Sequence, residues 1–330
     1  MTKAVFLGDQ PANIERVYAR GRRERVAALT DLYPVVVSQK TLAAYADDLA
    51  DVEVAFGTWG FPALTDQEID LLPSLKAVFY GAGSVQRFAE PFLRRGITVV
   101  SAWKANAVPV AEFCLAQILL ATKGYFRNSR ELTTPERWRG GVRGPGNFCE
   151  TISLIGLGQI STKLIELLRP FTLDVLVVST HMTEEEAERL GVRKVALEDA
   201  FREGYVVSNH LANLPATQGR LHGDLFASMR PNATFINTGR GAQVVEADLI
   251  RVLKERPDLT ALLDVTFPEP PVAVSELYTL PNVHLSSHIA GSIGDEVVRM
   301  ADYAIEEFER WRDGLPLQYA VSLEMLETMA

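Results

Sequence analysis

The sequence contains little cysteine. Its two residues, Cys114 and Cys149, are too few for a disulfide framework, and they lack the close spacing of metal-binding cysteines. We therefore expect no metal centre and two reduced, mostly buried thiols. With 330 residues, of which 47% are hydrophobic, the chain can bury a sizeable core without crosslinks, and its length suggests two domains.

Positive charge is also scarce. Lys and Arg total 33 against 42 Asp and Glu, which leaves a formal net charge of −9. A nucleic-acid-binding protein needs a basic face, so this balance argues against a nucleic-acid partner. An anionic ligand meets an unfavourable long-range field here, so any anion site has to be built from local positive groups.

Long apolar runs are absent. The first run, residues 4–8, is interrupted at once by Asp9 and Pro11, and a signal peptide needs a longer stretch. No window approaches the roughly 18 uncharged apolar residues of a spanning helix. The sequence therefore predicts no membrane association, and cytoplasm is the expected location.

Short apolar runs are present throughout, and they alternate with helical patterns such as residues 163–168 and 246–255. The runs occupy residues 4–8, 34–37, 52–57, 77–80, 98–101, 151–155, 175–179, 194–196, 205–208, 234–237, 261–265 and 283–286. Many are continuous in Val, Ile and Leu, as strands buried on both faces require. The pattern predicts an α/β protein with two doubly wound parallel sheets, whose ligands bind at the carboxyl ends of the strands.

Two long helical stretches, residues 106–126 and 295–311, look like connections between domains. Pro109 lies near the start of the first, where proline is tolerated. Residues 133–148 are rich in Gly, Arg and Pro, so we expect a loop or linker there.

A glycine-rich turn follows the apolar run at 151–155. Gly156 permits a tight turn, Gly158 lets the backbone approach a pyrophosphate, and Ser161 stands at the position of the third glycine. The helix that begins at Gln159 and Ile160 offers free N–H groups and a positive dipole end. An ordinary strand-to-helix turn is the alternative, but the strand–turn–helix context favours a dinucleotide site.

The end of the next strand lacks the acidic residue that binds ribose hydroxyls in such sites. Ser179, Thr180 and His181 stand there instead, and no arginine follows to bind a 2′-phosphate. The sequence does not decide between NAD and NADP, but it slightly favours tolerance of NADP.

Polar residues also follow three later strands. Arg240 lies between two glycines, Asp264 ends a strand whose proline-rich loop carries Glu269, and His288 follows the last run. Taken singly, they fit a surface charge, a turn residue and a capping residue. Taken together, they follow strands of one sheet that begins with a nucleotide turn, which favours a shared site.

With these motifs in this order, the chain resembles the D-isomer-specific 2-hydroxyacid dehydrogenase family. The resemblance is carried by blocks at residues 156–161, 206–211, 237–241, 264–270 and 288–291, and it extends to 78–83 and 106–112. It is weak before about residue 75. It implies a flavodoxin-like substrate domain of residues 1–104 plus 296–330, with an inserted Rossmann cofactor domain of residues 105–295. It also implies a homodimer formed through the cofactor domain, for which the apolar stretch 113–125 is suitable.

The chemistry of the trio suits hydride transfer between NAD(P)H and a small 2-oxo acid or D-2-hydroxy acid. Arg240 is suited to bind the substrate carboxylate and to polarise the ketone, because its guanidinium group is planar and always charged. His288 suits proton transfer, and Glu269 suits the stabilisation of its protonated form. These roles match the family's Arg, Glu and His. Substrate binding is also expected from the backbone of Gly81, Ala82 and Gly83, whose loop permits close approach.

The expected cofactor contacts follow the same strand ends, with Asp264 accepting from the nicotinamide carboxamide. They are Gly156, Gly158, Gln159, Ile160, Ser179, Leu211, Ala212, Thr238, Arg240, Asp264, His288 and Gly291. Ser179, Ser161, Ala212 and Ser287 depart from the family pattern. These departures put cofactor choice and binding strength in doubt rather than the class of reaction.

Two other functions are weighed. A dinucleotide-binding regulator resembling the C-terminal-binding-protein corepressors can keep the same trio. An amino-acid dehydrogenase is disfavoured by the order Arg, Glu, His. The sequence does not identify the side chain of the substrate. Four aromatic residues belong either to a substrate pocket or to the core: Phe56, Trp59, Tyr80 and Trp103. Lys104 is expected to add positive charge near the site.

Overall fold

The computed structural model describes residues 1–327, and the chain divides into two compact units. The first unit comprises Met1–Asn106 together with the segment from Ser292 onward, and the second comprises Ala107–Gly291. The sequence placed these boundaries after residue 104 and before residue 296. Asn106 and Ser292, the residues at the two boundaries, are joined by a hydrogen bond from the Ser292 N–H to Asn106 Oδ1 at 3.0 Å.

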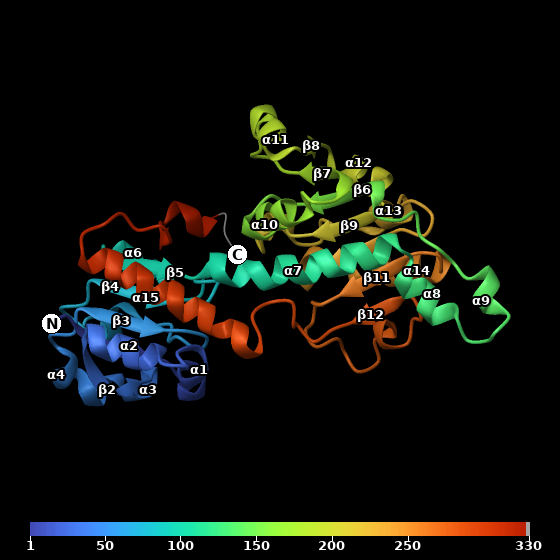
Figure 1. Ribbon diagram of the computed structural model, residues 1–330. Coiled ribbons are helices and arrows are strands. Elements are labelled where there is room, and N and C mark those ends of the chain that lie inside the picture. Colours follow the sequence, from blue (N-terminus) through green and yellow to red (C-terminus); the bar gives the residue numbers. More distant parts are fainter. Residues whose placement is uncertain (328–330) are drawn as a thin grey trace. The chain divides into compact units, whose positions relative to one another are not determined.

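The sheet of the first unit consists of short strands (Figure 1). Within residues 1–327 its spatial order is β13 (Ala320–Val321), β5 (Thr98–Ser101), β4 (Ala77–Tyr80), β3 (Val54–Gly57), β1 (Lys3–Leu7) and β2 (Asp31–Val37). All neighbours are parallel except β13, which pairs with β5 in the antiparallel sense at the edge. Every residue of β3 and β4 is buried, because helices cover both faces.

Helices from both ends of the chain cover this sheet. They are α1 (Pro11–Val17), α2 (Arg22–Leu29), α3 (Gln39–Leu42), α4 (Ala46–Leu49), α5 (Asp66–Ile69), α6 (Ala89–Arg94) and α15 (Val298–Arg312), with short 3-10 turns η1 (Ala43–Tyr45), η5 (Gly294–Val297) and η6 (Glu324–Glu327). Helix α15 contacts α1, α2, β4 and β5. The Arg22 guanidinium binds Asp302 at 2.8 Å, which fixes α15 to α2.

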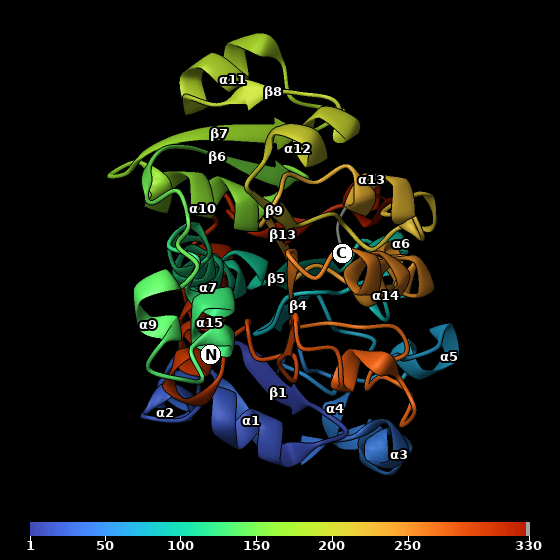
Figure 2. The same ribbon diagram turned by 90° about the vertical axis from the view of Figure 1, so that its right-hand side faces the viewer.

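The second sheet has the strand order of a dinucleotide-binding fold, and Figure 2 shows part of it. In the described part of the chain its order is β12 (Val283–Leu285), β11 (Thr260–Leu263), β10 (Thr234–Asn237), β9 (Val206–Asn209), β6 (Phe148–Ile155), β7 (Thr172–Val178) and β8 (Arg193–Lys194), all parallel. The order reverses between β6 and β9. Ligands bind such sheets at the carboxyl ends of the strands beside this reversal.

Helices cover both faces of the second sheet. The helices of this unit are α7 (Trp103–Thr122), which begins in the first unit, α8 (Tyr125–Glu131), the exposed α9 (Arg137–Gly140), α10 (Gln159–Leu168), α11 (Glu184–Leu190), α12 (Leu197–Glu203), α13 (Gly223–Ala227) and α14 (Glu246–Glu255), with η2 (Pro215–Thr217), η3 (Gly241–Gln243) and η4 (Glu276–Tyr278). One core includes Ile118 and Leu164, and the other includes Phe201 and Leu249. The predicted fold class, two doubly wound parallel sheets, is confirmed.

Three local predictions differ from the structure. The helix expected at residues 106–126 is broken, because Gly124 adopts a left-handed conformation between α7 and α8. The expected loop at 133–148 contains the one-turn helix α9. Cys114 is buried as predicted, but Cys149 is exposed. Cys149 has a φ of 53° and lies between Phe148 and Glu150, where the register of β6 shifts. This irregularity turns the thiol towards solvent.

Helix α7 is long and apolar enough to cross a membrane by length and composition alone, so the prediction that no window approaches such a span was too strong. Half of its apolar window is buried inside the structure. Val110, Cys114 and Ile118 belong to a core of the second unit. This packing is typical of a core helix in a globular domain.

Candidate active site

The glycine turn joins β6 to α10, and each glycine has its own structural reason. Gly156 has a φ of 98°, and a Cβ there would lie 2.9 Å from the carbonyl oxygen of His210. Gly158 caps α10, and a Cβ there would meet nothing within 4 Å. The space before the N-terminus of α10 is therefore open, as a bound pyrophosphate requires.

Ser161 explains how this turn manages without a third glycine. The residue is fully buried, and its Oγ donates a 2.7 Å hydrogen bond to the carbonyl oxygen of Gly156. A small side chain thus keeps the helix close to the strand and also ties the helix to the turn. Gly158 and Gln159 are exposed and Ile160 is half-buried, so the first turn of the helix faces solvent.

The end of β7 forms a turn closed by Ser179. Its Oγ accepts the main-chain N–H groups of His181 and Met182, both at 3.2 Å. Lys194 Nζ donates to the carbonyl oxygen of Met182 at 2.6 Å, which brings a positive charge to this turn. The sequence analysis missed Lys194, because only the pairing of β7 with β8 brings it there.

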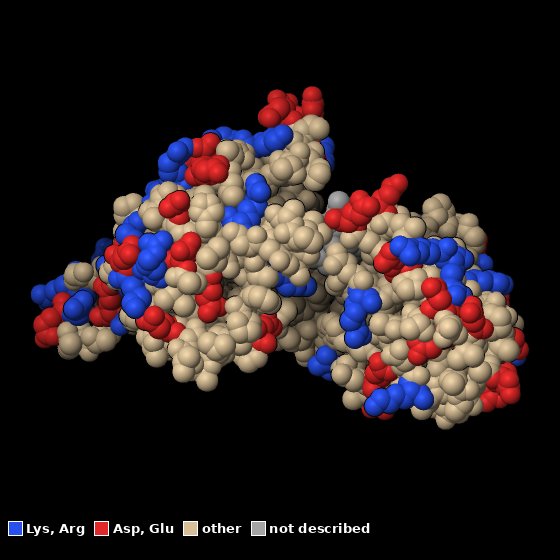
Figure 3. Space-filling model, turned by 180° about the vertical axis from the view of Figure 1, so that it is seen from behind, with Lys and Arg blue, Asp and Glu red and all other residues tan. Residues whose placement is uncertain are grey.

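Acidic residues oppose this charge nearby. The first turn of α11 carries Glu184, Glu185 and Glu186, and acidic side chains gather at that helix in the space-filling view (Figure 3). Elsewhere on the visible face, basic and acidic side chains are interspersed. The turn after β7 therefore offers a mixed electrostatic environment rather than a strongly basic one.

Thr238 follows β10 and lies in a buried polar chain. Its Oγ1 is 3.3 Å from Cys114 Sγ and 3.4 Å from His210 Nδ1, and His210 Nε2 is 2.9 Å from Ser208 Oγ. Burial lowers the pKa of His210 to about 4 and raises the pKa of the Cys114 thiol to about 12. Both groups are consequently neutral near pH 7.

Arg240 lies in the same strand-end region. Its Nη1 donates to the carbonyl oxygen of Gly239 at 2.8 Å. Burial lowers the pKa of Arg240, and the charge of Glu269 opposes this shift. A Cβ at Gly241 would lie 1.9 Å from the carbonyl carbon of Thr266, so only glycine lets the Arg240 turn pass against the Glu269 loop.

Asp264 fixes the turn that carries His288. Its carboxylate is buried and accepts hydrogen bonds from Ser286 Oγ at 2.6 Å and from the N–H groups of Ile289 and Ala290 at 2.8 and 2.9 Å. Its main-chain oxygen accepts the N–H of His288 at 3.0 Å. The sequence assigned this carboxylate to the nicotinamide carboxamide, and Oδ2, which accepts one hydrogen bond from Ala290, has room to accept a second.

Glu269 and His288 contact each other directly. Glu269 Oε1 lies 2.7 Å from His288 Nδ1, and both side chains are close to half exposed. A carboxylate can only accept, so Nδ1 carries the proton of this contact and Nε2 is left for chemistry. His288 has a φ of 57°, a left-handed conformation that the bonds from Asp264 hold in place.

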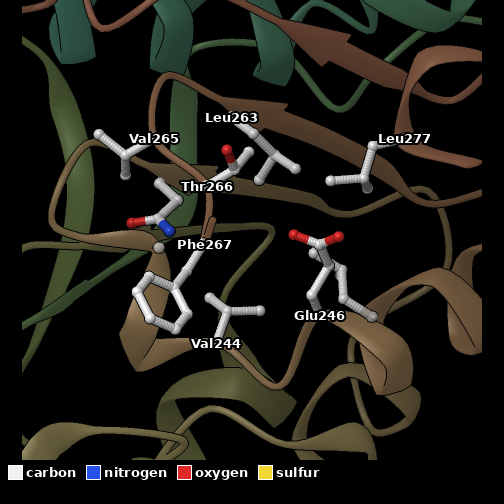
Figure 4. A pocket seen from close by; sticks show the side chains of 10 residues that line it. Val244, Glu246, Leu263, Val265, Thr266, Phe267 and Leu277 are labelled. Atoms are coloured by element: carbon white, nitrogen blue, oxygen red, sulfur yellow. The ribbon is translucent and has the colours of Figure 1, made fainter. Parts of the chain in front are cut away.

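Glu246 supports the loop that carries Glu269. Its carboxylate projects into a small pocket that includes Val244, Leu263 and Phe267 (Figure 4). Burial raises the pKa of Glu246, while hydrogen bonds from Ser275 and from the main chain of Phe267 oppose the shift. The sequence analysis missed this residue, whose partners lie at least twenty positions away in the chain.

Gly81, Ala82 and Gly83 belong to the first unit, whereas the other predicted site residues belong to the second. The N–H of Gly81 donates to the carbonyl oxygen of Gly57 at 2.8 Å, so this N–H already has a partner in the neighbouring strand. Ser101 Oγ donates to the carbonyl oxygens of Ala82 and Gly83. Within residues 1–327, the N–H groups of Ala82 and Gly83 have no main-chain partner.

The aromatic side chains near this loop divide into two groups. Phe56 and Tyr80 are buried in the core, whereas Trp59 and Trp103 are only partly buried. The Trp59 ring lies under the Arg16 guanidinium at 5.2 Å. Only the partly buried pair is thus available to line a pocket. Lys104, expected to add charge at the site, has its Nζ 5.7 Å from the ring centre of Tyr319.

Comparison with known proteins gives matches along most of the chain. The D-3-phosphoglycerate dehydrogenase of Bacillus subtilis is 25% identical over 290 residues, which are 88% of this chain and 55% of that protein. The one from Archaeoglobus fulgidus is 28% identical and covers 71% of this chain and 44% of its own length. The chain thus spans about half the length of these curated relatives.

Solved structures show the same fold. A phosphoglycerate oxidoreductase from Rhizobium etli has a TM-score of 0.82 at 21% identity, and the match covers 99% of this chain and 100% of that one. The apo D-mandelate dehydrogenase of Rhodotorula graminis has a TM-score of 0.79 at 20% identity, with 97% of each chain covered.

The family model described as "D-isomer specific 2-hydroxyacid dehydrogenase, NAD binding domain" matches residues 115–290. The matched range lies inside the second unit and contains the open glycine turn, so this unit is an NAD(P)-binding domain. The match covers more than half of the chain. The protein therefore belongs to the D-isomer specific 2-hydroxyacid dehydrogenase family.

Proposed function

We propose that the protein is an oxidoreductase that transfers hydride between NAD(P)H and a small 2-oxo acid, with the D-2-hydroxy acid as the reduced product. The observation that carries this proposal is the 2.7 Å contact of Glu269 with His288, in the unit that also holds Arg240 and the open glycine turn. Family membership supports the same reaction class.

In reduction, each of the three side chains has a separate role in converting the ketone to the hydroxyl group. The Arg240 fork binds the substrate carboxylate and polarises the ketone. His288 Nε2 donates a proton to the oxygen that becomes the hydroxyl, while Glu269 stabilises the imidazolium and sets its tautomer. In oxidation, Nε2 accepts the proton. The bound nicotinamide supplies or accepts the hydride.

The proposed cofactor contacts remain those at the strand ends, with the N-terminus of α10 facing the pyrophosphate. For the first unit, we propose that the N–H groups of Ala82 and Gly83 bind a substrate carboxylate oxygen. Fixed peptide groups support this role: Thr58 Oγ1 donates to the carbonyl oxygen of Gly81 at 2.7 Å, and Ser101 Oγ donates to that of Ala82 at 2.9 Å. The unit would then act as the substrate domain.

We propose that the protein accepts NADPH as well as NADH. The Ser179 hydroxyl in place of an acid removes a source of repulsion, and Lys194 adds a positive charge to the same turn. Separate titrations with the two reduced cofactors test this proposal. Dissociation constants within about tenfold of each other support it, and a preference for NADH by orders of magnitude contradicts it.

We also propose a homodimer formed through the second unit. Leu120 on α7 and Tyr125 on α8 are exposed apolar side chains in the stretch that the sequence analysis suggested. Sedimentation equilibrium across a range of concentrations tests this assembly. A monomeric mass at all concentrations contradicts it.

The reaction is tested with a panel of 2-oxo acids, including glyoxylate, hydroxypyruvate and phenylpyruvate, with NADH and with NADPH. Loss of reduced-nicotinamide absorbance supports the proposed function, together with a product of D configuration from hydroxypyruvate or phenylpyruvate, since the product from glyoxylate has no stereocentre. Clear cofactor binding without turnover of any acid favours a dinucleotide-binding regulator instead.

A further inference from the structure

Three side-chain amides form a buried network at the carboxyl ends of β9 and β10. Asn209, Asn237 and Gln243 are each 1% exposed or less. Asn209 Nδ2 donates to Asn237 Oδ1 at 2.9 Å and to Gln243 Oε1 at 2.6 Å. Buried amides are costly unless their hydrogen bonds are made, so this network strongly restricts the loops that it joins.

The Gln243 side chain has hydrogen-bond partners in two segments of the proposed site. Its Oε1 accepts the main-chain N–H of Arg240 at 3.1 Å. Its Nε2 donates to the carbonyl oxygens of Leu211 and Ala212 at 2.7 and 2.9 Å. One side chain therefore connects the turn that carries Arg240 to the segment that we expect to line the cofactor.

The packing around this connection leaves little freedom for the Arg240 turn. A Cβ at Gly239 would lie 2.7 Å from Gln243 Oε1 and 2.9 Å from Asn209 Nδ2. Asn237 Oδ1 also accepts the N–H of Gly239 at 3.1 Å. The main chain next to Arg240 thus rests against the amide groups themselves, and displacement of Gln243 has to move it.

We propose that Gln243 is a positioning residue that sets Arg240 for the oxo acid and the Leu211–Ala212 segment for the cofactor at the same time. This inference rests on the proposed function. It goes beyond that function because Gln243 is fully buried and its side chain bonds only to protein groups, so that it acts through its neighbours. A merely structural amide would contribute to stability without affecting the two binding steps.

The test compares Gln243→Leu with Asn282→Leu. Asn282 is also buried, and its Nδ2 donates to the carbonyl oxygens of Leu253 and Arg256 at 3.0 and 3.5 Å. It immediately precedes β12, so it lies at the amino end of the sheet, opposite the site loops. Both substitutions remove a buried amide that donates to two carbonyl groups, but only one of these amides belongs to the network.

For Gln243→Leu we expect the dissociation constant of NAD(P)H and the KM of the oxo acid each to rise about tenfold, because four polar partners lose their hydrogen bonds. We expect kcat at saturation to fall as well, because Arg240 also polarises the ketone, but less than about tenfold, because the Glu269–His288 contact is untouched. Asn282→Leu should change each constant less than twofold, although both variants unfold at lower urea concentration.

The inference is overturned if Gln243→Leu loses stability as Asn282→Leu does and yet binds cofactor and oxo acid like the wild type. If Gln243→Leu does not fold, Gln243→Met, which keeps an unbranched chain, is measured in its place. Failure of the proposed function is seen separately, as absence of turnover in the wild type. The inference is then decided by the dissociation constants of NAD(P)H and of oxamate, an unreactive isostere of a 2-oxo acid.

Discussion

Glu269 Oε1 lies 2.7 Å from His288 Nδ1, and this contact joins the proline-rich loop after β11 to the turn after β12. The carboxylate fixes one ring tautomer, so the imidazole presents Nε2 for proton transfer. The Asp264 carboxylate supports the same arrangement by accepting the N–H groups of Ile289 and Ala290, which follow His288 in the chain. Both loops are therefore fixed by hydrogen bonds that involve carboxylates.

Removal of the imidazole should affect the chemical step. We expect His288→Ala to lower kcat by about 10²- to 10⁴-fold with little change in the KM of the oxo acid, because general acid–base catalysis is lost. Glu269→Gln should lower kcat less, since the ring keeps a hydrogen-bond partner. Steady-state kinetics measure both effects, with the exposed His222→Ala as a control. A wild-type rate for His288→Ala would contradict the assignment.

Removal of the guanidinium should affect binding and chemistry together. Arg240→Ala is expected to raise the KM of the oxo acid and to lower kcat, because one group binds the carboxylate and polarises the ketone. Arg240→Lys should recover only part of the activity, since an ammonium lacks the planar fork. Arg202→Ala, which removes an exposed arginine of α12, is the matched control. Unchanged KM in Arg240→Ala would exclude a role in carboxylate binding.

Stability should decrease in acid because of His210. Its pKa is about 4 in the folded protein against an ordinary value of 6.5, so the unfolded chain binds more protons between these two values. The contribution is complete above pH 6.5 and is lost as the pH falls towards 4, by about 3 kcal/mol.

Urea unfolding from pH 7 to pH 4 measures this slope. His210→Gln, which cannot take up a proton, should lose less free energy of unfolding over that range than the wild type. The exposed His222→Gln should retain the full slope. Identical slopes for wild type and His210→Gln would show that His210 does not carry the effect.

The two thiols should differ in reactivity. Cys149 is exposed, whereas burial raises the pKa of Cys114 to about 12 and keeps it in the unreactive thiol form. A chromogenic disulfide reagent at pH 8 should therefore modify Cys149 alone in the folded protein. Cys149→Ser should abolish the reaction until a denaturant exposes Cys114. Rapid modification of folded Cys149→Ser would contradict the buried placement.

Much of the second unit was predictable because its signals are local. The apolar run before Gly156, the turn itself and the helix after Gly158 are contiguous, so a short window of sequence is enough to identify them. The direct contact of Glu269 with His288 was also expected, since the loops that follow neighbouring parallel strands meet at one edge.

Other features depend on residues that are distant in the chain. The hydrogen bond from the Gly81 N–H to the carbonyl oxygen of Gly57 follows from the pairing of β4 with β3. Lys194 reaches the turn after β7 only through the pairing of β8. No periodicity or spacing in the sequence reports these contacts, because side-chain and main-chain partners are chosen by packing.

The sequence by itself determined the alternation of strands and helices, the nucleotide turn, the order Arg240, Glu269, His288 and the likeness to the family, since each is written in neighbouring residues. Only the tertiary structure decided that Asp264 holds a turn, that Cys149 faces solvent and that Gln243 joins two loops. These outcomes depend on burial and on which polar groups satisfy one another, and both are properties of the folded chain.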